Sequence, residues 1–404
     1  MSYNLQPHHL EQAQQFLRNV PLAADGLPAV DIERFWADND LACADPFGAD
    51  IPQVAFGASC NWECVFEEMG IAQDWWRWQH DHQWRYDLSV TYNDKSESIV
   101  GRRLLEEAMP VPEEAGESWW APKVGKLNDV FEMAEVWDAA SQSYWMHEAA
   151  TTEAELVALL DRVDARDIAS VILPDNWAEV KARLIDTGRP LPCYRAQRGP
   201  VTFATSMVGV EFLLFLILDN PALAGRLRDT ILRVMREIAS LLDAEAGYTP
   251  ATAPRGWYWL DDNCYLLNPA MYEQFALPIM QGMFDTYAPD PADHRGQHSD
   301  SAMGHLLPLL STCDLHDCNF GPTLTVEEIR RHMPTTVIQG QLAPITYSRN
   351  EHLNMVAELI RDIEQSRDAR GLMFTTAGSI NNGSRLEGMR LFMAAIQQLG
   401  RFDT

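Results

Sequence analysis

The chain has 404 residues, an apolar content of 47% and a net charge of -27, a composition typical of a globular protein with a sizeable core. Its strongly acidic charge disfavours nucleic acid and anionic lipid as partners. The longest apolar run, residues 212–218, is too short to cross a bilayer, so we expect a cytoplasmic protein with no membrane partner.

The N-terminal third is rich in aromatic residues and irregular in pattern. Residues 84–105 predict two short strands around a turn at residues 92–95. Cys60 and Cys64 have no second cysteine pair nearby, which favours buried thiols over a metal site. We therefore expect residues 1–150 to form an extension that walls or covers a pocket. Ten of the thirteen tryptophans lie in it: Trp36, Trp62, Trp75, Trp76, Trp78, Trp84, Trp119, Trp120, Trp137 and Trp145.

From residue 151 to 404, strand and helix patterns alternate. Capping boxes at Thr152, Thr325, Ser348 and Ser384 indicate where helices begin. At least five strand–helix units follow residue 190, which predicts a parallel sheet covered by helices. Eight such units would close a (β/α)8 barrel, and a doubly wound sheet is the alternative. The sequence has no glycine-rich dinucleotide fingerprint and no phosphate loop, which disfavours nucleotide binding.

Polar residues follow the predicted strands at the ends that face the mouth of such a barrel. The strand at 256–263 ends in Asp262 and its neighbour, and the strand at 294–299 ends with His298 just before Asp300. We interpret Asp262, His298 and Asp300 as catalytic residues. His298 and Asp262 would act as acid and base if no metal is present. The predicted substrate-binding residues are Arg195, Asn319, Gln341, Thr376, Ser379 and Asn381. Each also has a structural interpretation, as a helix cap, a turn residue or a surface arginine.

Five segments taken together carry a resemblance to a known family: residues 198–227, 260–280, 298–310, 338–344 and 376–396. In this order they resemble the uroporphyrinogen decarboxylase-like superfamily, over roughly residues 190–400. The superfamily includes uroporphyrinogen decarboxylase and corrinoid-dependent methyltransferases. The resemblance implies a (β/α)8 barrel with its site at the carboxyl ends of the strands, in agreement with the pattern above.

The site residues depart from both well-known branches of that superfamily. An arginine-rich N-terminal segment that would hold porphyrinogen carboxylates is missing from residues 50–70. His298 matches the zinc-binding histidine of the methyltransferases, whereas Asp300 stands at their first cysteine and Ala377 at their last. Zinc also accepts carboxylate oxygen, so we expect a rebuilt zinc site of His298, Asp300 and Cys318, with Cys264 as the alternative to Cys318.

We therefore expect an enzyme that transfers a methyl or one-carbon group on a small, apolar or aromatic substrate. The resemblance implies a corrinoid protein as its partner and pairing into a homodimer. A metal-independent decarboxylase or lyase is the first alternative, and a non-catalytic small-molecule-binding barrel is the second.

Overall fold

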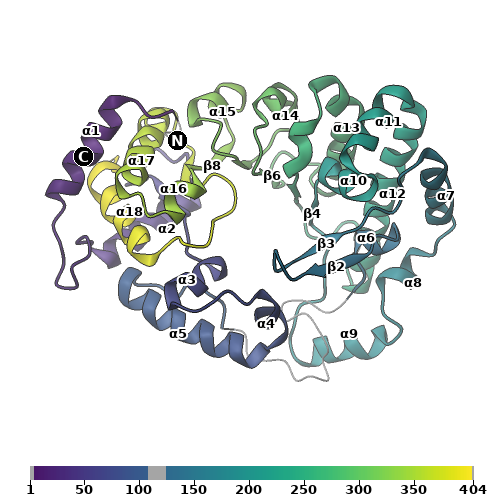
Figure 1. The fold of residues 1–404 in the computed structure, drawn as a ribbon, viewed down its shortest axis with the longest axis horizontal. Helices are drawn as coiled ribbons and strands as arrows, with labels where there is room; N and C mark the ends of the chain where they lie inside the picture. Colours follow the sequence, from purple (N-terminus) through teal and green to yellow (C-terminus); the bar gives the residue numbers. More distant parts are fainter. Residues whose placement is uncertain (1–3, 108–123, 403–404) are drawn as a thin grey trace. The chain divides into compact units, whose positions relative to one another are not determined.

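The computed structural model describes residues 4–107 and 124–402, which fall into two compact units (Figure 1). The first unit takes in Met1–Gln73, Gln83–Met109 and Gln297–Thr404, and the second takes in Asp74–His82 and Pro110–Gly296. The expected boundary at residue 150 lies inside the second unit and coincides with no limit of either. Trp119 and Trp120 of the expected aromatic wall lie outside the described residues.

The first unit is built on parallel strands in the order β1, β9, β8, β7, β6. Residue Gln341 of β8 pairs with Thr375 of β9, and Asp317 of β7 pairs with Val337 of β8. Most of these strands are buried on both faces, as expected for strands covered by helices. Their bounds are β1 Ala55–Phe56, β6 Arg295–Ser299, β7 Asp317–Phe320, β8 Val337–Leu342 and β9 Leu372–Thr376.

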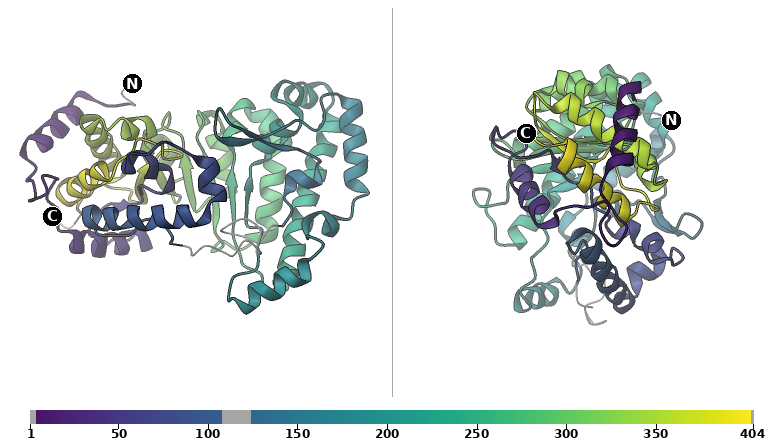
Figure 2. Two further views of the ribbon diagram at one scale, coloured as in Figure 1. Left: turned by 60° about the horizontal axis from the view of Figure 1, so that its bottom comes forward. Right: turned by 90° about the vertical axis from the view of Figure 1, so that its left-hand side faces the viewer.

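Helices cover these strands and pack on one another. The helices α15 and α17 contact β8, α2 contacts β1, and α1 lies against α17 (Figure 2). The helices with residues in this unit are α1 Pro7–Asn19, α2 Ile32–Ala44, η1 Trp62–Cys64, α3 Val65–Met69, α5 His82–Val100, η4 Gly304–Leu306, α14 Leu307–Leu310, η5 Ser311–Cys313, α15 Val326–His332, α16 Pro344–Ser348, α17 His352–Ser366 and α18 Leu386–Leu399.

The second unit contains two parallel strands, β4 (Ala196–Arg198) and β5 (Trp257–Leu260), and an antiparallel hairpin of β2 (Glu135–Asp138) and β3 (Ser143–Met146). The long helix α12 packs on α13 and α11. The helices of this unit are α4 Trp75–His80, α6 Leu127–Val130, α7 Glu153–Asp164, α8 Ile168–Ile172, α9 Trp177–Asp186, α10 Pro200–Val208, α11 Val210–Asp219, α12 Pro221–Glu245, η3 Asp262–Leu266 and α13 Pro269–Tyr287.

Strand–helix alternation confirms the predicted α/β fold of TIM-barrel type. Seven strands belong to the parallel arrangement within residues 4–107 and 124–402, one fewer than the predicted eight. In the same ranges no single helix is long and apolar enough to cross a membrane. The helices α10 and α11 together have the length and apolar composition of a membrane span, but a sharp bend separates them.

Two of the four predicted capping boxes correspond to real helix starts. The side chains of Thr152 and Thr325 accept hydrogen bonds from the amides three residues later, at the starts of α7 and α15. The boxes at Ser348 and Ser384 were wrong, because the next helices begin later, after Glu351 and Arg385. Ser348 instead ends the short helix α16.

The largest error of the sequence analysis concerns residues 84–105, because this segment is mostly the helix α5 and not two strands. The side chains that α5 buries recur every three or four residues, but most of them are polar, so no apolar stripe indicates the helix. Asn93, expected in a turn, accepts hydrogen bonds from the amides of Leu104 and Leu105. Its amide group therefore holds the next segment against α5.

Candidate functional site

The His-x-Asp sequence at the end of β6 brings two reactive side chains together. Residues two apart on an extended strand point to the same side, so His298 and Asp300 share one face. The His298 Nε2 atom lies 3.4 Å from the Asp300 Oδ1 atom. The predicted pairing of these two groups at the carboxyl end of the strand is therefore present in the first unit.

Asn319 on β7 sets the proton position on the His298 ring. Its Nδ2 atom donates to the carbonyl oxygens of Gln339 and Thr376, at 2.7 and 2.8 Å, so its Oδ1 atom must be an acceptor. That oxygen receives the Gly378 amide and lies 2.7 Å from His298 Nδ1. The Nδ1 atom therefore carries the proton, and in the neutral ring Nε2 presents a lone pair.

Asp300 is held against a turn that only glycine can make. The Ser379 amide donates to Asp300 Oδ1 at 2.9 Å. Gly378 has a φ of +94°, and a Cβ atom there would stand 1.9 Å from the same oxygen. Burial alone would raise the pKa of Asp300, but hydrogen bonds from His298 and Ser379 and the charge of His298 hold it below its ordinary value.

Glu63 is a third ionisable group at this site, and the sequence analysis missed it. It lies on η1, where Asn61 caps the helix by accepting from the Glu63 amide. Burial raises the pKa of Glu63 to about 7, and the negative charge of Asp300 adds to the shift. A carboxyl group whose pKa is raised by burial and by a second carboxylate is a candidate functional group.

The two cysteines that flank Glu63 serve as anchors, as their interpretation as buried thiols predicted. Cys60 and Cys64 are fully buried. The Cys60 Sγ atom lies 2.9 Å from the Tyr347 hydroxyl, and the Tyr92 hydroxyl donates to the Cys60 carbonyl at 2.6 Å. The segment that carries Glu63 is thus fixed at both ends. No motif in the sequence singles out Glu63, so this residue could be found only from the structure.

The remaining residues predicted in this unit hold loops and strands in place. The Thr376 hydroxyl donates to the Gly378 carbonyl at 2.9 Å, which shapes the turn that holds Asp300. The Gln341 Nε2 atom donates to the carbonyls of Gly321 and Leu324. Asn381 is exposed beyond the turn. Substrate contacts by these residues and by Ser379 stay predictions.

Cys318 does not join the ligand set of His298, which corrects the predicted zinc site. Successive residues of a strand point to opposite faces, and Asn319 uses the face of β7 that meets His298. The Cys318 side chain therefore lies on the other face, where it is fully buried and near Arg330 of α15. Burial raises the pKa of this thiol, so it is stable as a neutral buried group.

In the second unit, the carboxylate after β5 caps a helix. The Asp261 side chain is buried and accepts the amide and hydroxyl hydrogens of Thr202 near the start of α10, both at 2.8 Å. Burial raises the pKa of Asp261 to about 6 despite these bonds. Asp262 and Cys264 follow on η3, and a role for Asp262 with His298 stays a prediction.

Arg195 is engaged within the second unit and is not proposed as a substrate ligand. Its Nη2 atom contacts both carboxylate oxygens of Asp243, at 2.7 and 2.6 Å. Its other nitrogens donate to the carbonyls of Pro254 and Tyr194, and its guanidinium stacks 4.4 Å from the Tyr287 ring centre. Since every guanidinium nitrogen of Arg195 binds protein, its predicted role in substrate binding is corrected to a structural role.

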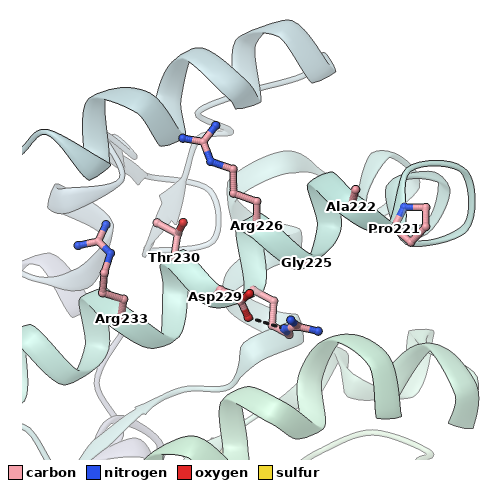
Figure 3. A pocket seen from close by; sticks show the side chains of 8 residues that line it. Pro221, Ala222, Gly225, Arg226, Asp229, Thr230 and Arg233 are labelled. Atoms are coloured by element: carbon pink, nitrogen blue, oxygen red, sulfur yellow. Dashed lines mark hydrogen bonds and ion pairs between the residues drawn. The ribbon is translucent and has the colours of Figure 1, made fainter.

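Two other features resemble sites but carry no chemistry of their own. A hollow of about 600 Å³ along α12 is lined by arginines (Figure 3). Arg226, Arg228 and Arg233 nevertheless all pair with carboxylates. In the first unit, His8 and His9 share the carboxylate of Glu364. The Gln6 amide donates to His9 Nδ1, so His9 Nε2 carries a proton and cannot bind a metal as a neutral ring.

Comparisons with known proteins agree with the geometry at the level of the fold. A family model described as uroporphyrinogen decarboxylase (URO-D) matches residues 177–399, more than half of the chain. A solved methyltransferase from Methanosarcina mazei is similar in structure, with a TM-score of 0.51 and 15% identity, covering 89% of this chain and 97% of that one. At this identity the likeness shows the fold alone. No curated protein sequence matches the chain.

Proposed function

The chain belongs to the uroporphyrinogen decarboxylase family, and we propose that it is a methyltransferase of this family that acts at His298 and Asp300. The orientation of His298 carries the proposal. Asn319 keeps a ring proton on Nδ1, so in the neutral ring the Nε2 lone pair faces the Asp300 carboxylate. A lone pair facing a carboxylate is unfavourable unless a cation lies between them, and either a metal ion or a second ring proton supplies one.

Zinc is the metal that the resemblance implies, and the donors in the first unit fit it. Neutral imidazole nitrogen and carboxylate oxygen are both zinc ligands. A metal-binding histidine also normally donates its other ring hydrogen to an acceptor, which here is Asn319. We propose that His298 Nε2 and Asp300 hold zinc. When bound, zinc would lower the pKa of a thiol that accepts the methyl group.

The residues of the chain position this site. Asn319 fixes the ring of His298, and the Gly378–Ser379 turn fixes the carboxylate of Asp300. In the transfer, the bond between the methyl carbon and its donor breaks with its electron pair left on the donor. The sulfur of the acceptor thiolate bonds to the methyl carbon as the donor bond breaks, so no free methyl cation forms. A corrinoid protein as partner, a small apolar or aromatic substrate, and a homodimer are further proposals that rest on the resemblance.

Decarboxylation is the alternative reaction, and Glu63 disfavours it. A decarboxylase must hold a substrate carboxylate, which the Glu63 carboxylate repels. Within residues 4–107 and 124–402, no arginine or lysine pairs with the Glu63 side chain. A non-catalytic binding barrel is the other alternative. In that case His298→Ala would leave ligand affinity intact, and no turnover would be found in the wild type.

Metal content tests the proposed function. We expect about one zinc ion per chain in protein purified without chelator, measured by mass spectrometry of the metal. His298→Ala and Asp300→Ala should each lose most of it, since each removes a proposed ligand. His332→Ala, on the outer helix α15, is the matched control and should retain it. Metal-free wild-type protein, or variants with undiminished zinc, would overturn the zinc site.

A further inference from the structure

We propose that the buried ion pair of Arg361 and Asp362 on α17 is a positioning group for the candidate site. The pair holds the backbone of Gln341 on β8, and contacts from β8 hold His298 and Asp300. This inference rests on the proposed function, since it takes those two residues as the site. Its supports are the end of a strand ladder at β8, the contacts of the ion pair with that strand, and two chains of contacts from the strand to the site.

The carboxyl end of β8 extends beyond the strand on one of its sides. Its ladder with β9 continues to Leu342, whereas its ladder with β7 ends at Ile338. Backbone groups past Ile338 that face away from β9 therefore need other partners, because a buried amide or carbonyl without one costs free energy. Gln341 is 1% exposed, so side chains of the protein must satisfy its backbone.

The ion pair bonds both backbone groups of Gln341. The Gln341 amide donates to Asp362 Oδ2 at 3.0 Å, and Arg361 Nη2 donates to the Gln341 carbonyl at 2.7 Å. The guanidinium also contacts Asp362 Oδ1 at 2.7 and 2.8 Å, and the two side chains are 1% and 0% exposed. A buried ion pair adds little stability over apolar residues of similar size, but apolar residues could not bond this backbone. The pair therefore determines where the end of β8 lies.

The first chain of contacts runs from β8 to His298. The carbonyl of Gln339, two residues before Gln341, accepts from Asn319 Nδ2 at 2.7 Å, and Asn319 Oδ1 lies 2.7 Å from His298 Nδ1. The Gln339 carbonyl is one of two carbonyls that fix which amide atom of Asn319 faces the ring. A shift of the strand end would weaken this bond and loosen the amide that holds the hydrogen on Nδ1.

The second chain of contacts runs from Gln341 to Asp300. The Gln341 Nε2 atom donates to the carbonyls of Gly321 and Leu324, at 3.3 and 3.0 Å. Gly321 packs so closely on the backbone of Asp300 that an added Cβ atom would lie 2.5 Å from the Asp300 carbonyl oxygen. The residue held by the ion pair thus supports the loop against which Asp300 rests. Displacement of Gln341 would disturb both proposed zinc ligands.

The hydrogen on His298 Nδ1 tests this inference with or without zinc, because its acceptor is Asn319 and not the group on the other ring nitrogen. Nitrogen-15 NMR of histidine-labelled protein measures the exchange of this hydrogen with water, and His298→Ala assigns the signal. The double variant Arg361→Met/Asp362→Leu removes both charges together, so neither is left buried alone and the fold should be retained. We expect roughly threefold to tenfold faster exchange in this variant, the change for one weakened hydrogen bond.

The ion pair of Arg401 and Asp38 provides the matched control. Its atoms lie 2.7 Å apart, its side chains are 9% and 17% exposed, and it joins α2 to the segment after α18 in the same unit. Arg401→Met/Asp38→Leu should leave exchange at His298 Nδ1 at the wild-type rate. Asp362→Asn is a second variant of the proposed pair, since its amino group would place a donor opposite either Arg361 or the Gln341 amide.

Each contrary outcome is decisive. Wild-type exchange in a folded variant of the Arg361–Asp362 pair overturns the inference, and so does equally fast exchange in the control. Failure of both variants to fold would assign the pair to the fold as a whole and would also overturn a positioning role. Zinc content of the same preparations separates the two proposals. Wild-type protein without zinc whose Nδ1 exchange depends on the pair contradicts the metal site alone, and zinc-bound protein whose exchange does not depend on it contradicts the positioning role alone.

Discussion

At the scale of single residues, Gly378 determines where the Asp300 carboxylate lies. Its backbone has a positive φ, and any side chain there would meet the carboxylate oxygen. A substitution of Gly378 therefore has two separate effects. The positive φ strains the backbone of any L-residue, which lowers stability, and the added Cβ atom displaces the Asp300 carboxylate.

These two costs can be separated by experiment. We expect Gly378→Ala to destabilise the protein by on the order of 1 kcal/mol or more and to reduce its zinc content. Gly247, at the end of α12, has a φ of +83° and nothing within 4 Å of an added Cβ atom, so Gly247→Ala should cost stability alone. Denaturant titration and metal analysis of both variants measure the two effects. Equal zinc content in the two variants would show that Asp300 does not depend on this turn.

The raised pKa of the Glu63 side chain predicts that the free energy of unfolding depends on pH. Its folded-state pKa of about 7 lies above the ordinary value of 4.5, so the folded protein holds this proton more tightly than the unfolded chain. The stability contributed by protonated Glu63 is therefore present below about pH 4.5 and is lost as the pH rises through 7.

Glu63→Gln should remove this loss. At pH 8 we expect the variant to be more stable than wild type by on the order of 1 kcal/mol, a value reduced for the partial exposure of the group, and at pH 4.5 the difference should be small. Denaturant unfolding at the two pH values measures this. Glu67→Gln controls for the loss of one negative charge from an acidic protein. A gain that is the same at both pH values, or equal in the control, would contradict the shifted pKa.

At the scale of elements, Asn319 ties together the carboxyl ends of β6, β8 and β9. It contacts His298, the Gln339 carbonyl and the Thr376 carbonyl from its place on β7. Asn319 was predicted to bind substrate, which stays a prediction, and in the structure its amide group orients the histidine. Alternation along a strand also explains why Cys318, its neighbour, could not be the ligand that the sequence suggested.

Removal of this amide should weaken metal binding without removing a ligand. We expect Asn319→Ala to lower zinc affinity by roughly 10- to 100-fold, the usual cost of losing the group behind a metal-binding histidine. Asn39 is a matched control, since its buried amide bonds both backbone groups of Phe56 on β1 and has no link to His298. Chelator competition measures both variants. Equal losses of affinity would indicate a general effect on folding.

The sequence predicted elements well where apolar and polar positions alternate clearly. The strands β5 and β6 lie within the predicted ranges 256–263 and 294–299. The helix α5 was missed because its buried face is polar, and the starts of α17 and α18 were misplaced because serine and glutamate at capping spacing also occur in turns. Glu63 could not be ranked from sequence, since its importance comes from the absence of a partner in space.

At the scale of the whole molecule, the chain combines the fold of its family with the candidate site at His298 and Asp300. The parallel strands and the family match together establish a TIM-barrel type of enzyme, as the sequence predicted. The division into two interleaved units was not predicted, because compact units depend on contacts between segments that lie far apart in sequence. The proposed metal centre has nitrogen and oxygen ligands, from His298 and Asp300.

X-ray absorption at the zinc edge of the purified protein tests this central claim most directly. Zinc–sulfur distances are near 2.3 Å and zinc–nitrogen or zinc–oxygen distances about 2.0–2.2 Å, so the two ligand types are resolved. We expect a zinc ion whose ligands include at least one imidazole and no sulfur. A sulfur ligand at about 2.3 Å, or a spectrum unchanged by His298→Ala, would contradict it.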